Sequence, residues 1–332
     1  MKWVRTILIL FVILLFLSVV TLKMGQIEIS ITQILDSFWI RSGYDLITDV
    51  IINLRLPRVI FAILSGAGLA LCGYIMQASI QNPLADPYVL GISSGASLGA
   101  SLAIVLNISL GSLIGDHLII SIFAFLGSFM TMVLVNLTSN YKGNATTERI
   151  ILSGVIANSL CIALTNLMMY LAKDAESVRN ITFWTMGSLS GISWTQVNLL
   201  TVATMISVIF FLTQYRALNL ISLGDEAAAS LGINVRKKRN IYILAVTFLT
   251  GVIVSQCGII GFVGLVVPHA VRKVCRTSSS HILPIVLLSG SVFMLFVDAL
   301  SRSILVHQEV PIGIVTSLIG APVFLFIFIK RK

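Results

Sequence analysis

The chain has 332 residues, of which 57% are hydrophobic and only 11% are charged, and its mean hydropathy is +1.01. This polar fraction is too small to cover the surface of a soluble domain of this length. The composition therefore excludes a soluble globular protein and indicates an integral membrane protein. The formal net charge of +9 is explained by basic loops on one side of a membrane, and it gives no reason to invoke nucleic-acid binding.

Ten apolar segments follow one another along the chain. A helix needs about 20 apolar residues to cross roughly 30 Å of hydrocarbon, and nine of the segments meet that need. The eighth is too short to span alone, and its Gly258, Gly261 and Gly264 before Pro268 predict a half-helix or re-entrant segment buried against its neighbours. The expected fold class is therefore an all-α integral membrane protein with about ten transmembrane helices in a single domain, residues 1–332. The segments cover approximately residues 4–23, 58–78, 89–107, 118–138, 150–171, 195–213, 240–256, 258–269, 282–300 and 311–329.

The first apolar segment follows Lys2 and Arg5 and has no small-x-small cleavage site at its end, so we expect it to remain as an uncleaved span. With the N-terminus placed inside, most of the 22 lysines and arginines fall in inner loops, as the positive-inside rule requires. Both termini are therefore expected in the cytoplasm.

Arg55, Arg58 and Arg302 are exceptions to this bias, because they stand at the outer ends of spans. Something else must keep them there. Arg302 lies four residues after Asp298, so these two side chains can pair along one helix face. Arg55 and Arg58 flank Pro57, a favourable first residue of a helix, and can anchor the span among lipid headgroups.

The turn between the second and third spans has the sequence Asn82-Pro83-Leu84-Ala85-Asp86-Pro87. Its two prolines preclude a regular helix, so we expect a fixed turn on the inner side. Such a turn can close a pore, and a plain helical hairpin turn is the alternative. In the third span, small residues from Gly91 to Ala100 allow close helix packing, and the same hydroxyl-rich surface can line a polar conduit.

A polar island, residues 216–239, separates the sixth and seventh spans. Asp225 and Glu226 begin a short alanine-rich stretch, at the helix end that favours negative charge, and Gly232 stands where such a helix would stop. We expect a short, capped helix on the inner face. It is either a lever that couples to a partner or a solvated loop helix.

The apolar segments lack the groups that other classes of membrane protein need. Every charged side chain falls in a loop or within about two turns of a span end, with Asp298 and Arg302 the deepest, which disfavours an ion-coupled carrier. The four histidines show no H-E-x-x-H spacing, and no Ser/His/Asp set converges on one span, so a membrane-embedded enzyme is also disfavoured and no catalytic residue is assigned. No phosphate-binding G-x-x-x-x-G-K-[ST] motif occurs, so any ATP that drives this protein must be bound by another subunit.

Several motifs occur in order over almost the whole chain, and each contains glycine or proline. They are Leu54-Arg55-Leu56-Pro57-Arg58, then Gln81-Asn82-Pro83-Leu84-Ala85-Asp86-Pro87, Leu90-Gly91-Ile92-Ser93-Ser94-Gly95-Ala96, Trp184-Thr185-Met186-Gly187-Ser188-Leu189-Ser190-Gly191, residues 223–232, Gly261-Phe262-Val263-Gly264-Leu265-Val266-Val267-Pro268-His269, Glu309-Val310-Pro311-Ile312-Gly313-Ile314-Val315-Thr316 and Gly320-Ala321-Pro322-Val323-Phe324.

In this order the motifs resemble the FecCD/BtuC-type permease subunits of ABC importers for ferric siderophores, haem and vitamin B12. The resemblance implies a subunit of the bacterial cytoplasmic membrane that moves an iron chelate, first of all a ferric siderophore, with haem and cobalamin as alternatives. The sequence departs from the family pattern after His269, where Arg276 to His281 replace the usual Gly-x-Asp-His-Arg stretch. The resemblance therefore implies no structure for the 272–281 loop.

The same resemblance implies partners and site residues. The partners are two copies of a cytoplasmic ATP-binding subunit, which would hold the ATP and Mg, an extracytoplasmic substrate-binding protein, and a second permease copy or a paralogue. No cofactor or metal is expected on this chain itself. The residues implied in coupling to the ATPase are Gly224, Asp225, Glu226, Ala229, Leu231 and Gly232. Those implied in docking of the binding protein are Arg55, Arg58 and Arg302. Those implied in an inner gate are Asn82, Leu84, Thr147, Glu148 and Leu152.

Overall fold

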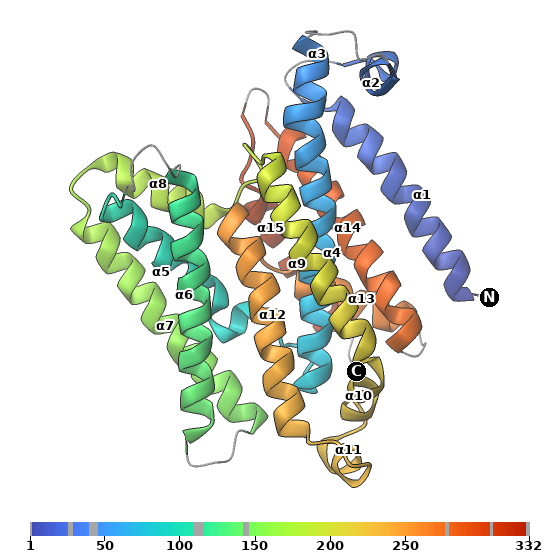
Figure 1. Cartoon of the computed structure of the whole chain (residues 1–332), viewed down its shortest axis with the longest axis vertical. Helices are drawn as coiled ribbons and strands as arrows, with labels where there is room; N and C mark the ends of the chain where they lie inside the picture. The colour runs from blue at the N-terminus through green and yellow to red at the C-terminus, as the bar shows by residue number, and fades with distance from the viewer. Residues whose placement is uncertain are drawn as a thin grey trace.

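A computed structural model describes residues 2–25, 29–39, 46–108, 116–141, 146–275, 279–305 and 308–329 of the chain (Figure 1). In these ranges the regular elements are all helices. They are α1 (Lys2–Lys23), α2 (Ile31–Trp39), α3 (Leu46–Asp49), the π-helix η1 (Val50–Arg55), α4 (Leu56–Ser79), the 3₁₀-helix η2 (Pro87–Leu90), α5 (Ile92–Val105), α6 (Asp116–Ser139), α7 (Thr147–Leu171), α8 (Ala175–Met186), α9 (Trp194–Thr213), α10 (Tyr215–Ile221), α11 (Asp225–Ser230), α12 (Val235–Cys257), α13 (Val263–Val274), α14 (Ser279–Ser303) and α15 (Ile312–Ile329).

The expected all-α fold is confirmed, and each of the ten apolar segments overlaps one helix. In chain order these are α1, α4, α5, α6, α7, α9, α12, α13, α14 and α15. Within the described ranges, seven helices are long and apolar enough to cross a membrane. So many long apolar helices are typical of a multi-pass membrane protein.

Two of the ten segments differ from their predicted bounds because glycine and proline interrupt the backbone. The third helix, α5, begins at Ile92 rather than at residue 89, since Pro87 starts a 3₁₀ turn that ends at the left-handed Gly91 (φ 80°). The eighth was expected over 258–269. Left-handed Gly258 (φ 73°) and Phe262 (φ 67°) keep its first part non-helical, and α13 runs from 263 to 274 with Pro268 inside it.

Helix α4 lies at the centre of the bundle, and α9, α12, α13 and α14 pack around it (Figure 1). Glycines permit the closest approaches. A Cβ added to Gly73 would overlap the carbonyl of Gly264 on α13, and Gly66 faces Gly290 of α14 in the same way. Small residues therefore form the close-packing surface of α4.

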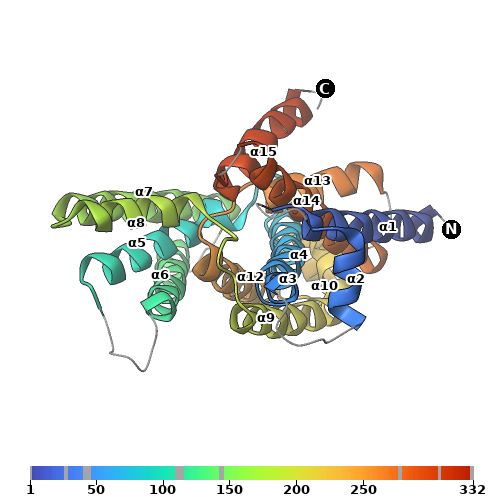
Figure 2. The same cartoon turned by 90° about the horizontal axis from the view of Figure 1, so that it is seen from above.

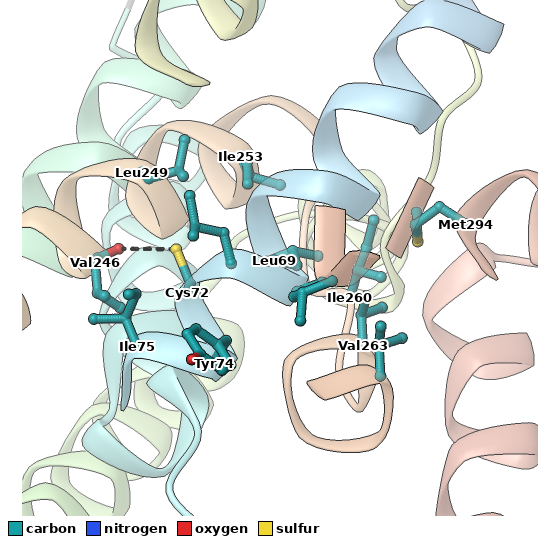
Figure 3. Close-up of a cluster of buried hydrophobic side chains, with 14 of the residues drawn as sticks. Leu69, Cys72, Tyr74, Ile75, Val246, Leu249, Ile253, Ile260, Val263 and Met294 are labelled. Atoms are coloured by element: carbon teal, nitrogen blue, oxygen red, sulfur yellow. Dashed lines mark hydrogen bonds between the residues drawn. The ribbon is translucent and has the colours of Figure 1, made fainter. Parts of the chain in front are cut away.

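Larger side chains fill the spaces beside these glycines (Figure 3). Leu69, Cys72 and Ile75 of α4 are all under 2% exposed, and they pack with Val246, Leu249 and Ile253 of α12 and with Ile260, Val263 and Met294. Such dense packing makes α4 a rigid connection between the two ends of the molecule.

Two groups of helices lie beside this central bundle (Figure 2). On one side, α5 packs against α6, α7 and α8. On the other, α1 packs on α14, and α15 projects away from the body of the molecule. Helix α11 lies at one extremity of the bundle and α3 near the other (Figure 1). We call these the α11 end and the α3 end.

Candidate functional site

Helix α11 is the short helix that the sequence predicted between the sixth and seventh spans. Gly224 (φ 124°) precedes it and Gly232 (φ 83°) follows it, and these backbone angles favour glycine at both positions. Ala228 is fully buried against the bundle, whereas Glu226 is exposed. Leu223 and Leu231 are 70% and 61% exposed beside it. Ala229 is exposed as well. Two exposed leucines around a fixed helix form a surface suited to a protein partner.

Asp225 is half-exposed, and its carboxylate is bonded to the bundle. Its carboxylate accepts two hydrogen bonds from Nη2 of Arg239 on α12, at 2.9 and 3.0 Å, and one from Nε2 of Gln81 at 2.7 Å. Asp225 therefore fixes α11 to the rest of the molecule, a role that sequence reasoning missed because Gln81 and Arg239 are distant in the chain.

The turn after α4 is non-helical, as its two prolines predicted. Oδ1 of Asn82 accepts a hydrogen bond from the backbone N–H of Leu84 at 2.9 Å, which is an Asx turn. Thr147, at the start of α7, donates its hydroxyl to the carbonyl of Ile80 at 3.4 Å. Three of the residues assigned to the gate are thus at or near this turn. The other two, Glu148 and Leu152, lie on the exposed surface of α7.

Asp86 is buried far more deeply than its position in a loop suggested. It is 4% exposed, it caps η2 by accepting from the N–H of Tyr88 at 2.8 Å, and a Cβ added to Gly264 would lie 3.2 Å from its Oδ2. Burial raises its pKa to about 6. The turn therefore folds back beside α4 to the level of Gly73, about 9 Å from the end of that helix.

A cleft of about 300 Å³ lies between α5, α7 and α8, and both polar and apolar side chains line it. The small hydroxyl-rich surface predicted for the third span contributes to it, since Ser93, Ser94 and Ser97 line one side. Amide and hydroxyl groups of α7 and α8 line the other. The remaining lining residues are Asn158, Ile162, Thr165, Asn166, Met169, Thr185 and Ile259. None of these lining residues is charged, so a cargo in this cleft would not be held by an ion pair.

Arg55, Arg58 and Arg302 lie at the opposite end of α4 from α11, and all three side chains are engaged within the chain. Arg58 pairs with Asp298 at 2.9 Å and with Glu309 at 2.7 Å, and Asp298 also pairs with Arg302. The pairing of Asp298 with Arg302, one of the alternatives raised by the sequence, is therefore present.

Backbone carbonyls complete this arrangement and join it to the end of α1. Nη1 of Arg55 donates to the carbonyls of Leu22 and Lys23 at 2.7 and 2.9 Å, and Arg302 donates to the carbonyl of Thr21 at 3.2 Å. Asp298 is fully buried, and Arg55 and Arg58 are 7% and 8% exposed. We call Arg58, Asp298, Arg302 and Glu309 the ion-pair cluster. In this conformation its arginines are not presented to a partner, and their role in docking stays a prediction.

Among the described residues, no three His, Cys, Asp or Glu side chains lie close enough together to hold a metal ion. The 272–281 loop is only partly described: α13 ends at Val274 and α14 begins at Ser279, while residues 276–278 lie outside the described ranges.

Comparison with known proteins agrees with this geometry. The model of the FecCD transport family matches residues 10–330. The hemin transport system permease protein HmuU of Yersinia pestis is 36% identical over 97% of this chain and 95% of its own length. The vitamin B12 import system permease protein BtuC of Vibrio parahaemolyticus is 34% identical over 99% of this chain and 95% of its own length. A solved structure described as an inward-facing metal-chelate type ABC transporter has a TM-score of 0.86 at 31% identity, covering 98% of this chain and 99% of that chain.

Proposed function

Because the chain belongs to the FecCD transport family and is an ABC importer permease of that type, we propose that it moves an iron chelate, first of all a ferric siderophore, into the cytoplasm by alternating access. The observation that carries this proposal is the uncharged cleft between α5, α7 and α8, lined by both hydroxyl and apolar side chains, in a chain whose relatives are named for hemin and vitamin B12. Haem and cobalamin are the alternative cargoes. Uptake of the three chelates, compared in parallel, distinguishes them.

The proposed source of energy is a separate cytoplasmic ATP-binding subunit, present in two copies and carrying the ATP and Mg. Helix α11 supports this assignment, because it combines a fixed attachment to the bundle with an exposed surface of Glu226, Leu223 and Leu231. A second permease copy or a paralogue is proposed to complete the pathway. The exposed apolar side chains of α7, among them Val155, Ile156 and Leu160, support such a pairing.

Changing the exposed surface of α11 should uncouple transport. Glu226→Lys reverses a charge at the start of the helix, and Gly232→Leu adds bulk to the exposed surface at a position whose φ of 83° also strains any residue other than glycine. Both variants should insert into the membrane at wild-type levels but lose at least roughly tenfold in uptake, the factor that corresponds to about 1.4 kcal/mol of lost contact energy. Copurification of the ATP-binding subunit and uptake, measured on the same membranes, check this. Normal uptake by both variants would remove the coupling role from α11.

Docking of an acidic binding protein is proposed for the α3 end, which the positive-inside rule places outside. Arg58 and Arg302 already have carboxylate partners within the ion-pair cluster. Docking on Arg58 therefore requires that a carboxylate of the binding protein replace that of Glu309. Glu309 is the suitable ligand to be displaced, because its side chain is 39% exposed while that of Asp298 is fully buried. Complementary charge would then set the register and the rate of encounter.

This exchange makes a prediction about Glu309. In Glu309→Gln the competing charge is removed and Arg58 keeps Asp298, so the binding protein should bind about two- to fivefold more tightly, as expected for a partly exposed ion pair. Titration of the binding protein against reconstituted permease measures the change. The matched control is Asp36→Asn on α2, which removes an exposed charge at the same end and should leave the affinity unchanged. Equal or weaker binding by Glu309→Gln would contradict docking on Arg58.

A further inference from the structure

Gln81 connects α11 directly to the turn that follows α4. Its Nε2 donates a hydrogen bond to the carbonyl of Ile221, the last residue of α10, and another to Oδ1 of Asp225, the first residue of α11, both at 2.7 Å. One amide thus holds the chain on both sides of the Ser222–Gly224 link that leads into α11. Gln81 is also the residue immediately before the Asx turn at Asn82.

The backbone at Gln81 is held in an unusual conformation. Its φ is +56°, in the left-handed region that residues other than glycine and asparagine rarely adopt. Such a conformation persists only where surrounding contacts maintain it, and the two hydrogen bonds of the side chain are contacts of that kind. The position of the turn therefore depends on where α10 and α11 lie.

Arg239 completes the connection from the side of α12. Its Nε donates to the carbonyl of Ser79, the last residue of α4, at 2.9 Å, and its Nη2 makes the two bonds to Asp225. The side chain of Arg239 is buried while that of Asp225 is 49% exposed, and hydrogen bonds between charged groups are the stronger class. One guanidinium therefore joins the end of α4 to the start of α11.

We propose that Gln81 and Arg239 are positioning residues that transmit movement of α11 to the Asn82–Asp86 turn, so that the ATP-driven displacement of α11 moves the inner gate. The inference rests on the proposed function of the chain as an ATP-driven permease. It adds a direct side-chain connection to the covalent path through α10 and α12. In the absence of that connection α11 can move without carrying the turn with it.

The test compares transport with ATP hydrolysis in the same proteoliposomes, which contain the permease, its ATP-binding subunit and its binding protein. The ferric siderophore, haem or cobalamin that the wild type takes up is the probe. Gln81→Met keeps the length of the side chain but removes both N–H donors. Arg239→Met removes the guanidinium. The matched control is Lys238→Met, the neighbouring position on α12, whose Nζ donates to Oε1 of Gln214 and not to the turn or α11.

Gln81→Met and Arg239→Met should each lower uptake per ATP hydrolysed roughly tenfold, the loss expected for hydrogen bonds to a charged group, while hydrolysis stays within about twofold of wild type. Lys238→Met should keep the wild-type ratio. Arg239→Lys should give an intermediate ratio, because one ammonium cannot reproduce the planar fork that reaches both Asp225 and Ser79.

A merely structural role would lower uptake and hydrolysis together and leave their ratio unchanged, which would overturn the inference. If Arg239→Met does not purify as a stable protein, Gln81→Met decides the question, since Gln81 is exposed and carries no charge. A wild-type ratio in Gln81→Met would overturn the inference and leave the proposed function intact. Absence of ATP-driven uptake by the wild-type complex for all three chelates would overturn both.

Discussion

Replacing Asp298 by alanine should destabilise the folded chain by about 3–5 kcal/mol, the usual cost of removing one partner from a buried ion pair. Asp298 is fully buried and is shared by Arg58 and Arg302, so its loss removes the negative charge between two buried guanidinium groups, of which only Arg58 keeps another carboxylate, that of Glu309. Thermal unfolding in detergent should show a lower midpoint, and less of the protein should accumulate in the membrane.

The matched control for this change is Asp49→Ala. Asp49 is exposed and accepts a hydrogen bond from Asn53 at 2.6 Å within its own helical segment, so its removal should change stability by less than about 0.5 kcal/mol. Equal unfolding midpoints for the two variants would show that the ion-pair cluster does not stabilise the α3 end. That result would also favour a role for Arg58 and Arg302 in binding a partner protein.

Replacing Gly73 by alanine should have a similarly large effect, through packing. A Cβ at this position would overlap the carbonyl of Gly264, so α4 and α13 must move apart, at a cost at or above the 1–3 kcal/mol typical of overpacking. Because Asp86 lies against Gly264, the displacement should also disturb the turn after α4 and lower uptake.

Gly261→Ala is the control for this packing effect. Nothing lies within 4 Å of a Cβ built on Gly261, and its φ is not positive, so alanine fits there without strain. The unfolding midpoint of Gly261→Ala should equal that of the wild type, whereas that of Gly73→Ala should fall clearly. If both variants unfold at the wild-type temperature, the close approach of α4 and α13 in this conformation is not needed for stability.

The positions of the spans could be predicted from the sequence because hydropathy and length are local properties, and the bilayer requires both. Local backbone effects decided the exceptions. Gly258 and Phe262 displaced the eighth helix by five residues, and Gly91 delayed the third. Helix α8, which lies across the others, was not predicted, although its N-cap was visible in the sequence as Asp174 followed three residues later by Ser177.

The candidate sites divide in the same way between local and long-range features. The acids and glycines that define α11 lie close together in the sequence, so the helix could be predicted. The attachment of α11 to the turn after α4 could not be predicted, because Gln81 lies 144 residues before Asp225. At the other end of α4, the pair of Asp298 and Arg302 follows from a spacing of four residues. The pair of Arg58 and Asp298 joins positions 240 residues apart and is visible only in the folded chain.

The measurement that tests the central claim most directly is uptake of radioactive iron by cells lacking this gene, complemented with the wild-type chain. Ferric siderophores, haem and free iron are offered in parallel with labelled cobalamin, and each assay is repeated with the partner ATP-binding subunit inactivated at its phosphate-binding lysine. We predict uptake of one chelate, first of all a ferric siderophore. This uptake should require both the chain and the active ATP-binding subunit. Uptake that depends on the chain but persists without ATP hydrolysis would contradict the account and indicate an ion-coupled carrier.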